Sequence, residues 1–526
     1  MKRIFLAFLI ALGATRALCG GDATQLTTGP GNDTEVAWSP DGKQVVFQTD
    51  RNGDLDLYVL DLATKKLRPL VTGPGHACFP AWSPDGEWIA YAYAHFTKTA
   101  REKNEHGYNI FAIPSKGGEP RRLTSGLFRD YSPVFSVDGR TIYFSSARFP
   151  KINGVGIFSI PFAGGEPKPV VSLGRKDEAA VQPDFSADGK FLAYGYIHGF
   201  RGNWSVRIAK TKRPADSLPL SDGRTVFYGP RWSPKEKLIA STGYVVGDPG
   251  WNIWLISLEP LQRVRITKGP GNSRSPSWSP DGRELIFENN RTGTYKLYRM
   301  PVPKLPDAPK PVADENARTV LRFDFSKNPG DVPQDLSDCR NVATTHGAAS
   351  WRDGAMCFDG KDAWIAMEKP KGFDFGAGIF CVKATVSVPS HTGEVRIICV
   401  GDYPDSHNGW QLYLGPSNRA YFNSRNSEKL YIGAVSDDEI PIGRPVTLLG
   451  MRLKSGEVKL FVDGALQRRP RSGAIMSYPE PNQVRIGAQW NGKSLFGGQI
   501  YELAVYTREL TEGEIEGDSL RRFLRD

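Results

Sequence analysis

The stretch Trp38-Ser39-Pro40-Asp41-Gly42 decides the fold of the N-terminal half, because it returns along the chain. Identical copies stand at residues 82–86 and 278–282, and degenerate copies begin at Phe135, Phe185 and Trp232. Successive copies are 44 to 53 residues apart. A period of this length is typical of one four-stranded blade of a β-propeller. The sequence therefore predicts six blades.

Each copy is followed by the same pattern of residues. Pro at the second and Gly at the fourth position of the Ser-Pro-Asp-Gly segment favour a tight turn. An alternating strand such as residues 44–47 comes next, then a polar turn and a second strand such as residues 57–60. We expect the aromatic residue before each turn, here called the anchor, to pack between neighbouring blades.

A second repeated segment indicates how the propeller closes. Residues 70–75 (Leu-Val-Thr-Gly-Pro-Gly) and 266–271 (Ile-Thr-Lys-Gly-Pro-Gly) end their blades, and residues 26–31 carry the same signature before the first anchor. The N-terminal strand, Thr24 to Thr28, is therefore predicted to form the outer edge of the sixth blade, which hides a strand edge.

These repeats resemble those of the TolB-type propellers over residues 22–304. The resemblance implies the fold. It says little about activity, because the same blade occurs in envelope binding proteins, in gating domains of peptidases and in some lyases. No peptidase domain follows in this sequence.

The C-terminal half has a different organisation. Residues 305–317 belong to a proline-rich linker, and a new set of strands begins near residue 318. Its segments 320–325, 356–360, 458–464 and 496–506 resemble the laminin-G-like jelly rolls of the concanavalin A-like lectin and glucanase superfamily, over residues 318–526. The fold class expected is all-β, a six-bladed propeller followed by a β-sandwich jelly roll.

The first 21 residues read as a signal peptide. Lys2 and Arg3 precede an apolar run from Ile4 to Leu12 that is too short to span a bilayer. We expect an exported protein, periplasmic or extracellular, with no transmembrane segment in the mature chain. Cys19 leaves lipid attachment open as an alternative to ordinary cleavage.

Charge argues against nucleic acid as a partner. The net charge is +10, but the basic residues are dispersed among acids, without runs or known nucleic-acid motifs. The expected partner is a protein or glycan ligand of the cell envelope or the exterior.

Four cysteines lie in the C-terminal domain. An exported chain favours disulfides, with buried thiols as the alternative. Cys381 and Cys399 stand nine places either side of residue 390, in what reads as a hairpin, so we predict that they are bridged. Proximity in the sequence suggests a second bridge between Cys339 and Cys357.

The propeller face that carries the connections between blades is the first candidate binding surface. Loops on a rigid repeat are a usual place for recognition, with packing against neighbours as the alternative. Residues just before each anchor are expected to gather there around the central channel, namely Glu35, Phe79, Tyr131, Gln182, Tyr228 and Arg274.

The jelly roll offers aromatic rings beside amides, a combination typical of sugar binding, although alternate aromatics on strands also build cores. The candidates are Trp410, Tyr413, Tyr421, Asn423 and Trp490. The resemblance to the superfamily further implies a structural Ca²⁺ at Asp335 and Glu502.

No catalytic residues are predicted. The sequence has no Gly-x-Ser-x-Gly, His-Glu-x-x-His or Walker-type motif. The function expected is therefore an exported, non-catalytic protein that binds a protein or glycan through the propeller face, the jelly roll or both. The alternative is a carbohydrate-active enzyme, a polysaccharide lyase or hydrolase, with an unrecognised site on the propeller face.

Overall fold

The computed structural model divides into two compact units, residues 1–308 and 309–526, which are described separately. It describes residues 23–95, 107–149, 154–172, 178–198, 203–220, 225–245, 247–307, 319–326, 332–376, 378–391, 393–401, 409–425, 431–467, 481–489 and 494–525. The predicted signal peptide lies outside these ranges.

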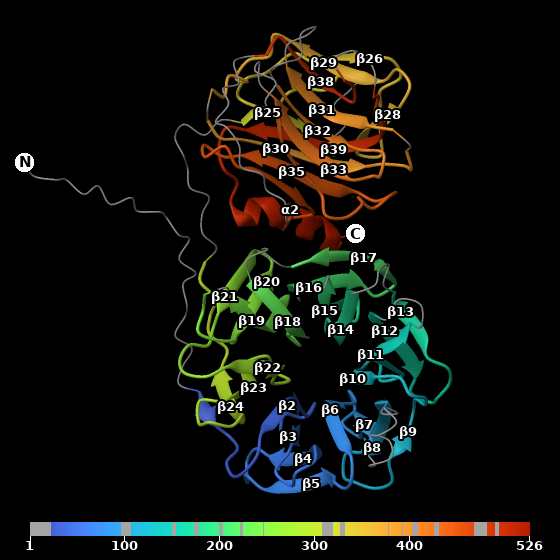
Figure 1. The fold of residues 1–526 in the computed structure, drawn as a ribbon, viewed down its shortest axis with the longest axis vertical. Helices are drawn as coiled ribbons and strands as arrows, with labels where there is room; N and C mark the ends of the chain where they lie inside the picture. Colours follow the sequence, from blue (N-terminus) through green and yellow to red (C-terminus); the bar gives the residue numbers. More distant parts are fainter. Residues whose placement is uncertain are drawn as a thin grey trace, which may run out of the picture. The chain divides into compact units, whose positions relative to one another are not determined.

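The first unit is a ring of largely antiparallel sheets, with the six strands that end at the anchors innermost (Figure 1). Four sheets are separate and four-stranded, and a fifth has eight strands. The strands of the separate sheets are β2 (Asp33–Trp38), β3 (Gln44–Thr49), β4 (Asp56–Asp61) and β5 (Leu67–Val71); β6 (His76–Trp82), β7 (Trp88–Ala94), β8 (Asn109–Pro114) and β9 (Arg121–Arg122); β18 (Thr225–Trp232), β19 (Leu238–Val245), β20 (Asn252–Leu258) and β21 (Leu261–Arg265); and β22 (Ser273–Trp278), β23 (Glu284–Asn289), β24 (Lys296–Pro301) and β1 (Thr24–Gln25).

The eight-stranded sheet departs from the simplest form of the expected six blades, in which each blade is a separate sheet. It holds the repeats anchored at Phe135 and Phe185, which a single parallel pair, Val155 with Ala179, joins. The long β12 pairs with β14, the first strand of the next repeat, and this pairing joins the two repeats into one sheet. Its strands are β10 (Asp130–Phe135), β11 (Thr141–Phe149), β12 (Gly154–Pro161), β13 (Lys168–Val171), β14 (Glu178–Phe185), β15 (Phe191–His198), β16 (Asn203–Lys210) and β17 (Arg213–Pro219).

The predicted closure by the N-terminal strand is confirmed. β1 pairs antiparallel with β24, Thr24 lying opposite Arg299. Beyond the strand, the Leu297 N–H donates to the Thr27 hydroxyl over 3.0 Å, and the Leu26 N–H donates to the Leu297 carbonyl over 2.8 Å. The two ends of the propeller sequence thus share one sheet.

The repeated turn is held by its own side chains. The Ser39 hydroxyl donates to the Asp41 carboxylate over 2.7 Å and accepts the Gln44 N–H over 2.9 Å. The same pair of bonds recurs at Ser83, Ser136, Ser186 and Ser279. The anchors also join neighbouring repeats, since the Trp82 indole donates to the Ala37 carbonyl over 3.2 Å.

The second unit is a sandwich of two antiparallel sheets with the apolar core between them. One sheet has eight strands, β25 (Thr319–Asp324), β27 (Ser350–Arg352), β28 (Ala355–Asp359), β39 (Gly497–Tyr506), β30 (Phe380–Ser387), β35 (Val446–Arg452), β36 (Val458–Val462) and β37 (Ala465–Leu466). The other has seven, in the order β26 (Thr344–His346), β29 (Trp364–Glu368), β38 (Gln483–Ile486), β31 (Val395–Gly401), β32 (Gly409–Leu414), β33 (Ala420–Arg425) and β34 (Tyr431–Val435).

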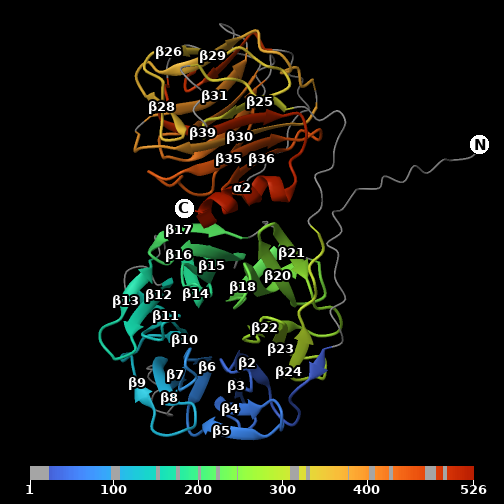
Figure 2. The same cartoon turned by 180° about the vertical axis from the view of Figure 1, so that it is seen from behind.

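The helix α2 (Glu512–Arg525) packs on the outer face of the eight-stranded sheet (Figure 2). Leu510 and Ile515 meet Cys381, Leu449 and Met451 there. Within the described residues no helix is long and apolar enough to cross a membrane. The seven-stranded sheet turns its own outer face away from the core, without a described helix over it.

The predicted disulfides are wrong. Cys381 lies on β30 in the eight-stranded sheet and Cys399 on β31 in the seven-stranded sheet, so the two strands cross the sandwich and form no hairpin. Cys339 and Cys357 are not bridged to each other either. Cys381 is fully buried, and its thiol donates to the Arg508 carbonyl over 3.0 Å.

Candidate functional site

Each innermost propeller strand carries a bulge just before its anchor. The register shifts there in all six copies, and one residue takes a positive φ between 48° and 60°. These residues are Glu35, Phe79, Ser132, Gln182, Gly229 and Ser275. In five copies a proline follows. A bulge re-aims the neighbouring side chains.

The bulges also tie neighbouring repeats together. In four copies the bulge N–H donates to a polar side chain on the second strand of the preceding repeat, as from Phe79 to Gln48 over 3.0 Å and from Ser275 to Thr242 over 3.0 Å. At the seam where the ring closes, the acceptor is a carboxylate: the Glu35 N–H donates to Glu288 over 3.3 Å. The acceptor position on the second strand, which holds a neutral side chain in the copies above, therefore holds the acid Glu288 at the seam.

Three of the six predicted propeller residues gather at that seam. Glu35, Tyr228 and Arg274 interact electrostatically with one another and with Glu288. The other three lie elsewhere around the innermost strands. Phe79 and Tyr131 contact each other with ring centroids 5.8 Å apart, and the Gln182 N–H donates to the Ser145 hydroxyl over 3.0 Å.

Two carboxylates meet in this seam cluster. The Ser275 hydroxyl lies 3.1 Å from a Glu35 oxygen and 3.4 Å from a Glu288 oxygen, and Arg274 Nε lies 3.0 Å from Glu288. Burial, reinforced by the Glu35 carboxylate, raises the pKa of Glu288 well above its usual range, against the opposing effect of Arg274. Glu288 can therefore hold a proton beside a second acid.

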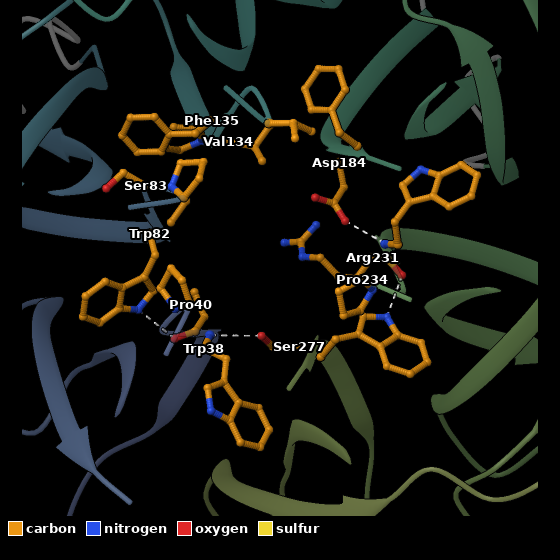
Figure 3. A pocket seen from close by; sticks show the side chains of 18 of the residues that line it. Trp38, Pro40, Trp82, Ser83, Val134, Phe135, Asp184, Arg231, Pro234 and Ser277 are labelled. Carbon is orange, nitrogen blue, oxygen red and sulfur yellow. Dashed lines mark hydrogen bonds between the residues drawn. The ribbon is translucent and has the colours of Figure 1, made fainter. Parts of the chain in front are cut away.

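The same innermost strands line a cavity of about 460 Å³ that extends to the Ser-Pro turns (Figure 3). The residue directly before each anchor faces it, in order Ala37, Ala81, Val134, Asp184, Arg231 and Ser277. Four of these are small or apolar and uncharged, whereas Asp184 and Arg231 bring opposite charges from neighbouring repeats. The cavity is therefore polarised on one side.

Asp184 has a structural partner in the cavity wall. Its carboxylate accepts the Trp232 N–H over 2.7 Å, as the Ser277 hydroxyl accepts the Trp38 N–H over 3.2 Å in the equivalent place. Burial raises the pKa of Asp184 to about 6, with Arg231 acting in the opposite direction. Sequence reasoning missed this pair, although charges in a repeat position that is otherwise small were a visible signal.

In the jelly roll, the structure separates the predicted sugar-binding residues. Trp410 is wrong as a ligand residue: it is 2% exposed and lies in the core, 5.1 Å from Phe380 between ring centroids. Tyr413, Tyr421 and Asn423 lie on the outer face of the seven-stranded sheet, because Leu412, Leu414 and Phe422 between them point into the core. Trp490 lies outside the described residues.

The three remaining residues make one contiguous group. The rings of Tyr413 and Tyr421 stack with centroids 5.0 Å apart and 14° between their planes. The Asn423 amide donates to the Tyr413 hydroxyl over 2.7 Å, and Gln411 is its cross-strand neighbour. Two tyrosine rings and two amides therefore share this face; Tyr421 and Gln411 are half-buried, and Tyr413 and Asn423 are buried, 7% and 3% exposed.

Two arginines complete the outer face, and the sequence reading missed both. Arg396 is paired in register with Tyr413, and its guanidinium lies 4.1 Å from the Tyr413 ring centroid. Arg485 lies 4.3 Å from the ring centroid of Trp364. In the sequence, an isolated Arg on a strand is indistinguishable from an ordinary solvent-exposed residue. Only the pairing register of the strands shows that these two lie beside aromatic rings. The outer face is defined below as Arg396, Gln411, Tyr413, Tyr421, Asn423 and Arg485.

The predicted calcium ligands have other contacts. Asp335 accepts five hydrogen bonds, from the N–H groups of Arg322, Ser337 and Asn341 and from the side chains of Ser337 and Asn341. These donors make Asp335 a brace of its turn. Glu502 lies on β39 opposite Asp324. The described residues contain no group of three or more His, Cys, Asp or Glu side chains that could hold a metal ion.

Comparison with known families covers both units. Residues 54–225 and 171–306 match the TolB β-propeller domain, and residues 359–516 match the concanavalin A-like lectin/glucanases superfamily. An uncharacterized protein of Agrobacterium fabrum is 32% identical over 71 residues, 14% of this chain and 24% of that protein. This chain covers no more than 24% of the length of the first curated relatives that it matches.

Solved structures also resemble the chain. The putative TolB of Agrobacterium tumefaciens is 20% identical, with a TM-score of 0.40, over 53% of this chain and 93% of that one. The sialidase of Trypanosoma rangeli is 11% identical, with a TM-score of 0.38, over 97% of this chain and 98% of that one. By its family matches, the chain contains a TolB β-propeller domain followed by a domain of the concanavalin A-like lectin and glucanase superfamily.

Proposed function

We propose that this is an exported binding protein that recognises a glycan through the outer face of its jelly roll. The observation that supports the proposal most is the stacked pair Tyr413 and Tyr421 beside the amides of Asn423 and Gln411. Aromatic rings pack against the apolar C–H faces of sugars, and amides donate to and accept from hydroxyl groups. A concanavalin A-like domain suits this role.

A glycan array with the full-length protein tests the proposal. Tyr421 is half-buried and stacks on the buried Tyr413, so it is the more exposed ring of the pair. We expect Tyr421→Ala to lose most of the binding, because the ring supplies contact area rather than a buried core contact. Tyr501→Ala, on the other sheet, is the matched control and should bind as the wild type does. Absence of any glycan binding, or equal loss in both variants, would refute the proposal.

The export part of the proposal rests on the N-terminal segment, Lys2 and Arg3 followed by the apolar run to Leu12. We infer cleavage near residue 21 and a periplasmic or extracellular location. Mass spectrometry of the N-terminus of the mature protein tests this inference. A mature chain that begins at Met1 in the cytosolic fraction would contradict it.

We also infer that the propeller functions as six blades, the eight-stranded sheet counting as two. Each of the six anchors ends the first strand of its own set of four strands. A single pair of residues joins β12 to β14. The propeller is then the rigid carrier of a second binding surface at the channel, for a protein or glycan partner.

A second candidate function is favoured by the seam cluster in the propeller. A carboxyl group that holds a proton beside another acid is a common arrangement for acid–base chemistry on carbohydrates. Glu288 and Glu35, with Arg274 and Tyr228 beside them, form such a set. Turnover of an acidic polysaccharide that Glu288→Gln abolishes would support an enzyme. No turnover over a broad pH range would leave the binding function as the account of this protein.

A further inference from the structure

Arg396 has a buried guanidinium with unused donors. It lies on β31, is 4% exposed, and points to the outer face over Tyr413. Its Nη2 donates to Glu394 over 2.8 Å. Its Nε and Nη1 atoms are buried and make no hydrogen bond within the described part of the chain. A charged group without acceptors in a site shielded from water is costly.

Arg485, on the same face, differs from Arg396 in that its Nε and Nη1 donors have hydrogen-bond acceptors. Its Nε donates to Gln483 over 2.7 Å, its Nη1 donates to the Gln489 carbonyl over 3.3 Å, and its guanidinium stacks on Trp364. Both arginines therefore stack on a ring, but only Arg485 has acceptors for these donors. Stacking alone does not explain why Arg396 keeps its donors unpaired.

The surroundings of Arg396 favour an anionic acceptor. Glu394 is the acid that pairs with it, and the Glu394 side chain is 47% exposed, so its charge is largely screened by solvent. Arg396 and Arg485 are cations on this side of the sheet, and the acids near them are Glu394 and, at the end of β29, Glu368, which is paired with Gln483. The planar guanidinium fork matches a carboxylate, which can take two N–H groups at once.

We propose that the outer face binds a glycan that carries carboxylate groups, such as a uronic or sialic acid residue, with the carboxylate on Arg396. The sugar ring then packs on Tyr421, and its hydroxyl groups meet Gln411. These are the half-buried ring and amide of this face, while Tyr413 and Asn423 support them from below. This inference rests on the proposed glycan-binding function and adds the class of sugar to it.

The first test uses paired ligands. An array of uronate- and sialate-containing oligosaccharides, each beside its carboxyl-reduced counterpart and a sulfated neutral analogue, is probed with the full-length protein. We expect binding to the carboxylated members and a roughly 10- to 100-fold loss on carboxyl reduction, the range of a hydrogen bond to a charged group. Binding to neutral or sulfated glycans alone would overturn this inference and leave glycan binding intact. No binding at all would overturn both.

The second test uses variants. Arg396→Met removes the charge and retains the bulk, so we expect the same loss for carboxylated glycans and unchanged binding of their reduced forms. Thermal stability should stay the same or rise, because an unsatisfied buried charge is removed. Arg444→Met, in the turn before β35 of the other sheet, is the control. A fall in stability with unchanged preference for carboxylated glycans would show that Arg396 is structural, and would overturn the inference.

Discussion

The propeller seam and the outer face of the jelly roll both bury charged groups, but they treat them differently. At the seam, Glu288 has Arg274, Ser275 and the Glu35 N–H around it, so the charge is part of how the ring closes. On the outer face, Arg396 keeps two donors without acceptors. Partners on the chain surround Glu288, although Arg274 Nε makes no hydrogen bond within the described residues, whereas Arg396 has two such donors, which we propose for a ligand.

The largest effect is expected at Trp410, which was predicted from the sequence to bind sugar and which the structure places in the core. Trp410→Ala should destabilise the jelly roll by about 3–5 kcal/mol, because it empties a core site among Phe375, Phe380 and Phe422. Calorimetry of the full-length protein measures the change. Trp410→Phe should be much milder and should keep glycan binding. Loss of binding in Trp410→Phe at wild-type stability would restore Trp410 as a ligand residue.

Next in size is the pH dependence of Asp184 in the propeller cavity. Its pKa is raised by burial to about 6, so the folded state holds the proton more tightly than the unfolded chain. This contribution to stability is complete below about pH 4 and is lost as the pH rises to about 6. Asp184→Asn removes the dependence and should be more stable by about 1–3 kcal/mol at neutral pH.

The difference in melting temperature between Asp184→Asn and the wild type, measured at several pH values, checks this expectation. The difference should grow from about pH 4 to about pH 6 and then level off. Ser277→Ala, at the equivalent position, lacks an ionisable group and should show a constant difference. A constant difference for Asp184→Asn as well would contradict the effect of burial on its carboxyl group.

A smaller effect is expected at the closure of the ring. Thr27→Val keeps the shape of a side chain that is 3% exposed but removes the acceptor of the Leu297 N–H. Leaving this buried donor unpaired should cost about 1–3 kcal/mol. Thr64→Val, at an exposed turn, should change stability by less than about 0.5 kcal/mol. Equal effects in calorimetry would mean that the N-terminal strand does not close the propeller.

The smallest effect is expected from reducing agents. No disulfide joins the described cysteines, and Cys381 and Cys399 lie in different sheets. Reductant should therefore leave the thermal unfolding of the protein unchanged, whereas loss of a native disulfide typically costs about 2–5 kcal/mol of stability. Mass spectrometry of the unreduced protein should find no disulfide at either residue. A Cys381–Cys399 peptide pair would contradict the strand arrangement.

The repeat allowed much of the propeller to be predicted from the sequence, because six copies of one pattern fix the strands, the turns and the closing strand. The jelly roll has single copies. β31 is nearly continuously apolar, whereas β30 alternates, with Lys383, Thr385 and Ser387 between its apolar residues; alternation gives the buried face of a strand but does not say whether two strands share a sheet. The hairpin between them and the bridge from Cys381 to Cys399 were wrong for that reason.

The candidate residues followed the same pattern. Trp410 and Tyr413 are three residues apart on one strand, so they cannot share a face, and alternation already separated them. Glu288 and Arg396 could not be found from sequence, because their roles depend on register and on neighbours from distant segments: Glu35 lies 253 residues from Glu288. Burial and hydrogen-bond partners, which only the fold provides, identify them.

Hydrogen exchange of the full-length protein, with and without the best glycan from the array, tests the central claim most directly. The account predicts slower exchange on glycan addition in the strands of the outer face, residues 395–401 and 409–425, and little change in the innermost propeller strands. Protection confined to the propeller strands around Glu35 and Arg274, with none on the outer face, would contradict it.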